Sequence, residues 1–122
     1  MPISIDYDRE ENVIYTKAEG EIRLDDILSY FSAVATLDLK KEYRVLADYS
    51  DAILKLSSED IQAVAKRREV ISAADDIIRI AVFCRKDLVF GLGRMYGALL
   101  GEDKYSTMIF RSKEEAVQWL DV

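Results

Sequence analysis

Residues 43 to 49, YRVLADY, decide the fold class of this chain. Their centre, Val45-Leu46-Ala47, is apolar at three successive positions, so both faces of an extended strand are apolar, as happens in a sheet that is covered on both sides. Residues 80 to 84, IAVFC, repeat the pattern. Between the two strands, Ser57 and Asp60 have the spacing of a helix capping box and precede apolar residues at helical spacing. This order of strand, helix and strand predicts a parallel βαβ unit.

Two further strand patterns and a helix precede this unit. Residues 3 to 7 alternate between apolar and polar side chains, and Val13 to Ala18 is rich in residues that favour strands. The short polar segment between them predicts an antiparallel hairpin. From Leu24 the apolar residues follow a helical period, and Asp25 or Asp26 can cap the start of that helix.

Three elements follow the βαβ unit. Residues 88 to 100 predict an apolar helix, and Thr107 to Phe110 predicts the last strand. Ser112 and Glu115 then form a capping box before the last helix. The whole order is β-β-α-β-α-β-α-β-α, an α/β fold with a mostly parallel mixed sheet and an N-terminal antiparallel hairpin. We expect one domain that spans residues 1–122.

Composition and charge restrict the function. Lys and Arg number 17 and Asp and Glu number 23, which gives a formal charge of −6, and this charge opposes the binding of nucleic acid. The chain has no histidine and a single cysteine, Cys84, so the commonest general base and a paired-cysteine zinc site are excluded. No pair of side chains can be assigned as nucleophile and base. We therefore expect a protein that is not an enzyme and that uses neither a metal nor a cofactor.

The sequence also bears on location. The N-terminus has no basic segment followed by an apolar one. No uninterrupted apolar run approaches the length that spans a membrane. We expect no transmembrane segment and a cytoplasmic location.

The stretch FGLGRMYG, residues 90 to 97, has three glycines within seven positions. A dinucleotide-binding fingerprint needs its third glycine one position earlier and a strand directly before the first. Here the segment Lys86-Asp87-Leu88-Val89-Phe90 lies between the preceding strand and the glycines. The glycines therefore lie inside the predicted helix 88–100, which we expect to end at Gly101.

This helix is apolar nearly all round. The face that we expect to lie on the sheet carries Leu88, Leu92, Met95 and Leu99. The candidate surface for a ligand or partner comprises Phe90, Gly93, Arg94, Tyr96, Gly97 and Ala98. Because Arg94 is the only charged residue between 88 and 100, we expect something other than water to cover the helix. Another helix of this chain, a second protein chain and an apolar ligand are the three alternatives.

Several of these segments, in this order, are similar to a known family. They are GEI at 20–22, VLADYSD at 45–51, RIAVFC at 79–84, FGLGRMYG at 90–97 and FRSKEEAVQWL at 110–120. The chain resembles the SpoIIAA-like family, a branch of the STAS-type domains, over essentially its whole length. The resemblance implies a STAS/SpoIIAA-like fold. It also implies one of two roles, either a protein-interaction switch of the kind that antagonises anti-sigma factors or a Sec14-type carrier of apolar molecules.

The resemblance further directs attention to the start of the second helix. Phospho-regulated STAS domains place a serine or threonine there, which makes Ser57 and Ser58 candidate phosphosites. The glycine of the family pattern is missing here, and Glu59 and Asp60 would repel a phosphate. A capping role already accounts for Ser57.

The sequence supports two functions. The first is a regulatory or binding module that acts through the surface of helix 88–100, with another protein or a second copy in a homodimer as its partner. The second is a carrier of small apolar molecules or lipids that makes transient contact with a membrane surface. The carrier predicts an apolar cavity beside helix 88–100, with Phe90 and Tyr96 touching the ligand or the bilayer. Arg94 could pair with an acidic head group or with an acidic side chain of this protein.

Overall fold

The structure is a computed structural model that describes residues 2–71, 78–100 and 105–122. In chain order the elements are β1 (Ile3–Asp8), β2 (Val13–Ile22), α1 (Leu24–Ala35), β3 (Arg44–Leu54), α2 (Ser58–Ile71), β4 (Ile78–Phe83), α3 (Asp87–Leu100), β5 (Tyr105–Phe110) and α4 (Lys113–Leu120). The strands form one sheet in the order β1-β2-β3-β4-β5. β1 is antiparallel to β2, and each later pair of neighbours is parallel. The α/β order and the N-terminal hairpin predicted from the sequence are confirmed.

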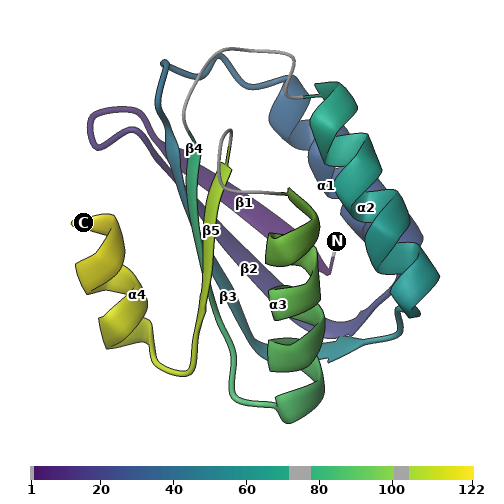
Figure 1. Cartoon of the computed structure of the whole chain (residues 1–122). Helices are drawn as coiled ribbons and strands as arrows, with labels where there is room; N and C mark the ends of the chain where they lie inside the picture. Colours follow the sequence, from purple (N-terminus) through teal and green to yellow (C-terminus); the bar gives the residue numbers. More distant parts are fainter. Residues whose placement is uncertain (1, 72–77, 101–104) are drawn as a thin grey trace.

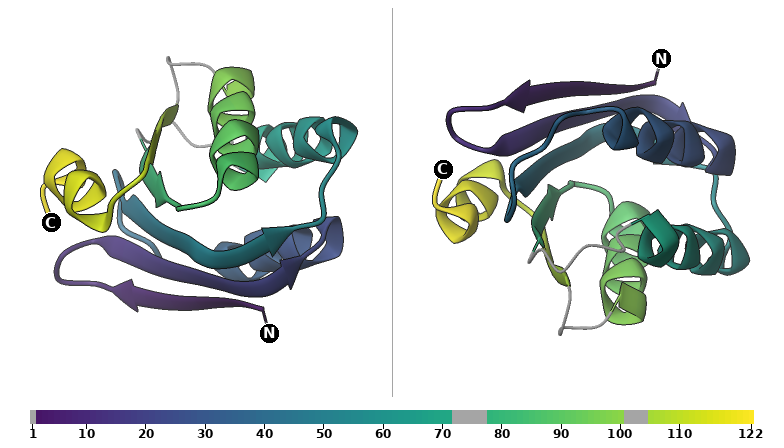
Figure 2. Two further views of the ribbon diagram at one scale, coloured as in Figure 1. Left: turned by 90° about the horizontal axis from the view of Figure 1, so that it is seen from below. Right: turned by 90° about the horizontal axis from the view of Figure 1, so that it is seen from above.

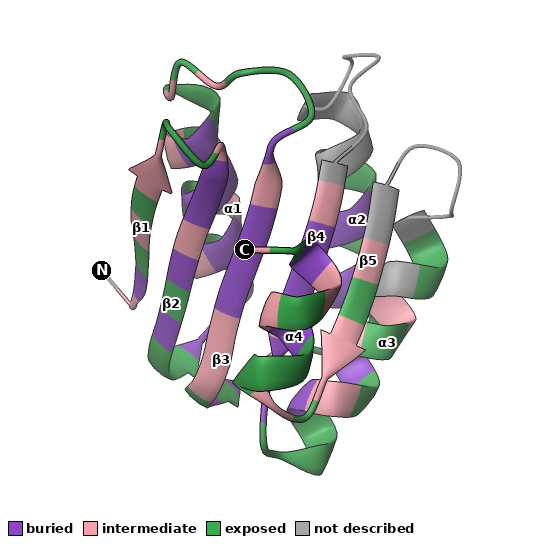
Figure 3. Ribbon diagram, turned by 90° about the vertical axis from the view of Figure 1, so that its left-hand side faces the viewer, coloured by how far each residue is buried: buried purple, intermediate pink, exposed green. Residues whose placement is uncertain are grey.

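The helices cover both faces of the sheet. α1, α2 and α3 lie on one face, and α4 lies alone on the other (Figures 1 and 2). Alternate residues of β3 enter two separate cores: Val45 and Ala47 belong to the core under α1, α2 and α3, whereas Leu46 belongs to the core under α4. Figure 3 shows the buried residues of β3 and β4 beside α4. This double coverage explains why the central strands are apolar at successive positions.

Polar side chains cap the helices as the sequence predicts. The Ser57 hydroxyl accepts a hydrogen bond from the Asp60 backbone N–H at 3.1 Å, and the Asp60 carboxylate accepts one from the Ser57 N–H at 3.0 Å. The Ser112 hydroxyl accepts the N–H of Glu115 at 3.2 Å. At α1, the Asp26 carboxylate accepts a hydrogen bond of 2.8 Å from the backbone N–H of Arg23, the residue before the helix. These bonds satisfy amides that have no partner within the first turn of a helix.

One strand is longer than its sequence pattern indicated. The strand predicted at residues 43–49 continues past Tyr49, and β3 ends at Leu54. β2 also continues to Ile22, past a register shift after Lys17, so the two strands stay paired to their ends. Ala52 is fully buried in this extension. From Asp51 to Leu54 exposed and buried residues alternate, as in a strand with one covered face. Pairing with β2 stabilises this extension although it begins with the polar residues Ser50 and Asp51.

Candidate functional site

The inner face of α3 matches the expected one only in part: Leu92 belongs to the core and Met95 packs against it, as the sequence predicts. Val89 and Leu92 face the core, with 3% and 9% of their surface exposed. Leu88 and Leu99, which we expected to lie on the sheet, are 62% and 41% exposed. A helix that is apolar nearly all round has no single dominant apolar face, and its own pattern therefore does not fix which side turns inward.

Gly93 explains part of this orientation. It was expected on the outer surface, but it lies against β5: a Cβ added there would be 3.0 Å from Cδ1 and 3.3 Å from Cγ1 of Ile109. Gly91 lies on the exposed side, where an added Cβ would meet nothing within 4 Å. At Gly93 the missing side chain therefore lets α3 lie close to β5 of the same chain. Gly97 is part of α3, but its surroundings fall outside the described part of the chain.

Phe90 is half-buried and packs against the core, whereas Arg94 is exposed. The guanidinium carbon of Arg111 is 4.2 Å from the centre of the Phe90 ring, and that of Arg94 is 5.8 Å from it. Arg111 also forms an ion pair with Asp87, at 2.9 Å between Nη1 and Oδ1. Ala98 is exposed. Phe90 is thus half-buried beneath cationic side chains, an arrangement that stabilises an aromatic ring at a surface.

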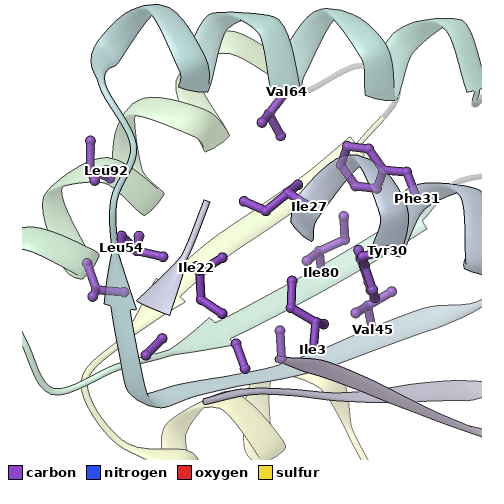
Figure 4. Close-up of a cluster of buried hydrophobic side chains, with 14 of the residues drawn as sticks. Ile3, Ile22, Ile27, Tyr30, Phe31, Val45, Leu54, Val64, Ile80 and Leu92 are labelled. Atoms are coloured by element: carbon purple, nitrogen blue, oxygen red, sulfur yellow. The ribbon is translucent and has the colours of Figure 1, made fainter. Parts of the chain in front are cut away.

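An apolar cavity of about 100 Å³ lies between the sheet and the helices α1, α2 and α3. The helices contribute Ile27 and Phe31 from α1, Ile61 and Val64 from α2, and Val89, Leu92, Gly93 and Tyr96 from α3. The strands contribute Val45, Ala47, Tyr49, Leu54, Ile80, Val82 and Ile109, together with Thr16. Figure 4 shows buried side chains from the sheet and all three helices in this interior, among them Val64, Ile27 and Ile80. α2 packs against both α1 and α3 and so forms one wall of the cavity.

Hydroxyl groups interrupt this apolar lining. Oγ1 of Thr16 and the hydroxyl of Tyr30 are 3.0 Å apart and buried. Tyr49 and Tyr96 also line the cavity. Burial raises the pKa of the Tyr49 phenol above its ordinary value of 10.0, and the nearby phenols of Tyr30 and Tyr96 raise it further. Three phenols, those of Tyr30, Tyr49 and Tyr96, thus belong to residues that line the cavity, and a phenol can both donate and accept a hydrogen bond.

The candidate surface predicted from sequence is thus divided. Gly93 and Tyr96 line the cavity, while Phe90, Arg94 and Ala98 lie outside its described lining. Sequence reasoning missed the contributions of Thr16, Tyr30 and Tyr49. They come from a strand, a helix and another strand that meet only in the folded chain, so no local pattern could have brought them together.

The described residues offer little support for a metal site, a phosphosite or a membrane-spanning helix. Among them, no group of three or more acidic or cysteine side chains is placed to hold a metal ion. Ser57 and Ser58 are exposed, and phosphorylation there stays a prediction. Within the described helices, none is long and apolar enough to cross a membrane. The apolar cavity is therefore the best-defined feature of the described structure.

Comparison with known proteins supports the fold. No family model matches the sequence, and no curated protein matches it. The structure is similar to the crystal structure of an uncharacterized protein of the DUF3478 family with a SpoIIAA-like fold, from Shewanella loihica PV-4. The two chains are 17% identical, the match covers 97% of this chain and 93% of that chain, and the TM-score is 0.61. This similarity shows that the chain has the SpoIIAA-like fold that the sequence resemblance implied.

Proposed function

We propose that this protein is a non-enzymatic binding module that takes up a small apolar molecule in the cavity beneath α2. The observation that carries the proposal is the cavity itself, about 100 Å³ in volume and lined by side chains from the sheet and three helices. This assignment follows the carrier alternative drawn from the sequence. It moves the binding site from the outer surface of α3 to the inner one.

The energetics of an empty cavity support binding. Empty volume enclosed in a protein core costs about 24 cal/mol per Å³, and on that scale about 100 Å³ corresponds to at most roughly 2 kcal/mol. An engineered apolar cavity of about 150 Å³ stays dry and binds benzene or xenon. A small apolar ligand can recover part of that cost here by restoring contacts that the lining side chains lack.

Benzene is a suitable first probe, and its binding can be followed by the shift in thermal unfolding. We expect benzene to stabilise the wild-type protein, by about 2.7 kcal/mol at a concentration one hundred times Kd. Val64→Phe places a ring in the cavity from α2 and should abolish this stabilisation. Val117→Phe is the matched control, because Val117 packs in the core under α4 on the other face of the sheet.

The outcome separates the cavity from other apolar sites. Loss of the benzene effect in Val64→Phe alone supports the proposal. No stabilisation of the wild type at saturating benzene would overturn it, and so would an effect that survives in Val64→Phe.

The exposed flank of α3 favours a second candidate function, the binding of another protein chain. Leu88 and Leu99 are 62% and 41% exposed, and Arg94 is the only charge along the helix between 88 and 100. Exposed apolar clusters rimmed by polar residues are typical of interaction sites. This flank replaces the predicted contact through Phe90, because Phe90 packs beneath Arg111.

Sedimentation at increasing concentration tests this second function. If two copies associate through α3, Leu99→Asp should yield a monomer, whereas Ile53→Asp should not, although Ile53 on β3 is similarly exposed at 44%. A wild-type protein that sediments as a monomer at high concentration would rule out the homodimer.

A further inference from the structure

We infer that the cavity selects an uncharged ligand with an apolar body and one hydrogen-bonding group, such as a phenol, an alcohol or a ketone, and rejects carboxylates and phosphates. This inference rests on the proposed function and specifies the class of ligand that the site takes. It depends on where hydroxyls and charges lie around the cavity.

The hydroxyls supply a specific polar contact. Tyr30, Tyr49 and Tyr96 come from α1, β3 and α3, so the group is assembled from different layers around the same chamber. Thr16 Oγ1 lies 3.0 Å from the Tyr30 hydroxyl and orients it. A phenol can both donate and accept a hydrogen bond. A tyrosine phenol, whose ordinary pKa is 10.0, is protonated across the physiological range of pH, and burial raises the pKa of Tyr49 further, so its hydroxyl can act as a neutral donor.

The distribution of charge excludes an anion. Among the described residues that line the cavity, none carries a charged side chain. Two basic residues beside α3 are engaged elsewhere: Lys86 Nζ donates to the Ala52 carbonyl oxygen at 3.0 Å, and Arg111 pairs with Asp87. A carboxylate in an apolar cavity without a counter-ion is strongly disfavoured. Arg94, which the sequence offered as a partner for an acidic head group, is exposed and is not part of the cavity lining described here.

Three ligands with the same ring test the inference: benzene, phenol and benzoate. Isothermal titration or ligand-detected NMR gives Kd for each. We expect phenol to bind roughly fivefold more tightly than benzene, the ratio that one net hydrogen bond supplies. We expect benzoate to bind at least tenfold more weakly than phenol, because it enters as an uncompensated anion.

Two variants connect the preference to the tyrosines. Tyr49→Phe removes the hydroxyl and keeps the ring, so phenol should fall to the affinity of benzene while benzene itself is unchanged. Tyr15→Phe is the matched control, since Tyr15 packs with the core on the α4 side of the sheet. Tyr96→Phe provides a second test within the tyrosine group should Tyr49→Phe fold poorly.

The results distinguish this inference from the proposed function. If benzene binds but phenol binds no better, or if Tyr49→Phe and Tyr96→Phe both leave the preference intact, the selection by hydroxyls is overturned and the cavity remains a binding site. Equal binding of benzoate and phenol would overturn the exclusion of anions. If none of the three binds, the proposed function itself fails.

Discussion

Two glycines on opposite sides of α3 provide a sharp test of how this helix lies on the sheet. Gly91 is exposed and an added Cβ would meet nothing within 4 Å, whereas at Gly93 it would lie 3.0 Å from Cδ1 of Ile109. Both residues are in the interior of the helix. Replacing either by alanine gains the same helix propensity, about 1 kcal/mol.

The two substitutions should therefore differ in stability. Gly91→Ala should raise the free energy of unfolding by about 1 kcal/mol, or Tm by about 3–5 °C for a chain of this size. In Gly93→Ala, the Ile109 side chain must move by a few tenths of an ångström, because Cγ1 as well as the flexible Cδ1 is close. Displacing a side chain from its rotamer costs about 0.5–1.5 kcal/mol. Gly93→Ala should thus be nearly neutral.

Urea unfolding followed by circular dichroism measures both changes, with equal m values as the check that only stability has changed. An equal gain in the two variants would show that Gly93 is not packed against Ile109. A loss of stability in Gly91→Ala would place Gly91 in contact with the core. Either result would refute the orientation of α3 and, with it, the assignment of the cavity wall.

Three further expectations concern buried polar groups. Within the described structure the buried Thr107 hydroxyl has no hydrogen-bond partner, so Thr107→Val should raise the free energy of unfolding by about 1 kcal/mol. If urea unfolding shows a decrease of about 1 kcal/mol instead, the hydroxyl has a partner. Burial raises the pKa of Tyr49 above its ordinary value of 10.0, so above that pH the unfolded chain loses the proton first and stability falls. The unfolding midpoint should therefore fall between a pH below 10.0 and a pH above it, and this fall should be smaller in Tyr49→Phe than in the wild type. An equal fall in the two proteins would contradict the burial of the phenol. Cys84 is fully buried, and burial raises the pKa of its thiol, so maleimide should label it only when urea opens the fold; rapid labelling of the native protein would count against this burial.

The sequence predicts the framework of this protein because local signals agree with tertiary packing. Each local pattern predicts the structure that is found. This holds for the doubly apolar strand around Leu46, for the hairpin, and for the serine-acid caps at Ser57 and Ser112. Consistency of this kind across levels is what makes a sequence specify one fold.

The site is less predictable because it depends on contacts between distant segments. The face of α3 that turns inward depends in part on Ile109 of β5, which fits against Gly93, and no pattern within the helix indicates that contact. Of the predicted inner face, Leu92 is buried, whereas Leu88 and Leu99 are exposed. The group of tyrosines around Tyr49 is likewise assembled only by folding.

Diffraction from a crystal of this protein pressurised with xenon would test the central claim most directly, because xenon enters dry apolar cavities and scatters strongly. The account predicts a xenon atom between the sheet and α2, close to Val64, Leu92 and Ile109, which line the cavity. Xenon bound elsewhere, or an interior filled by repacked side chains with no xenon among these residues, would contradict the existence of a ligand cavity in this fold.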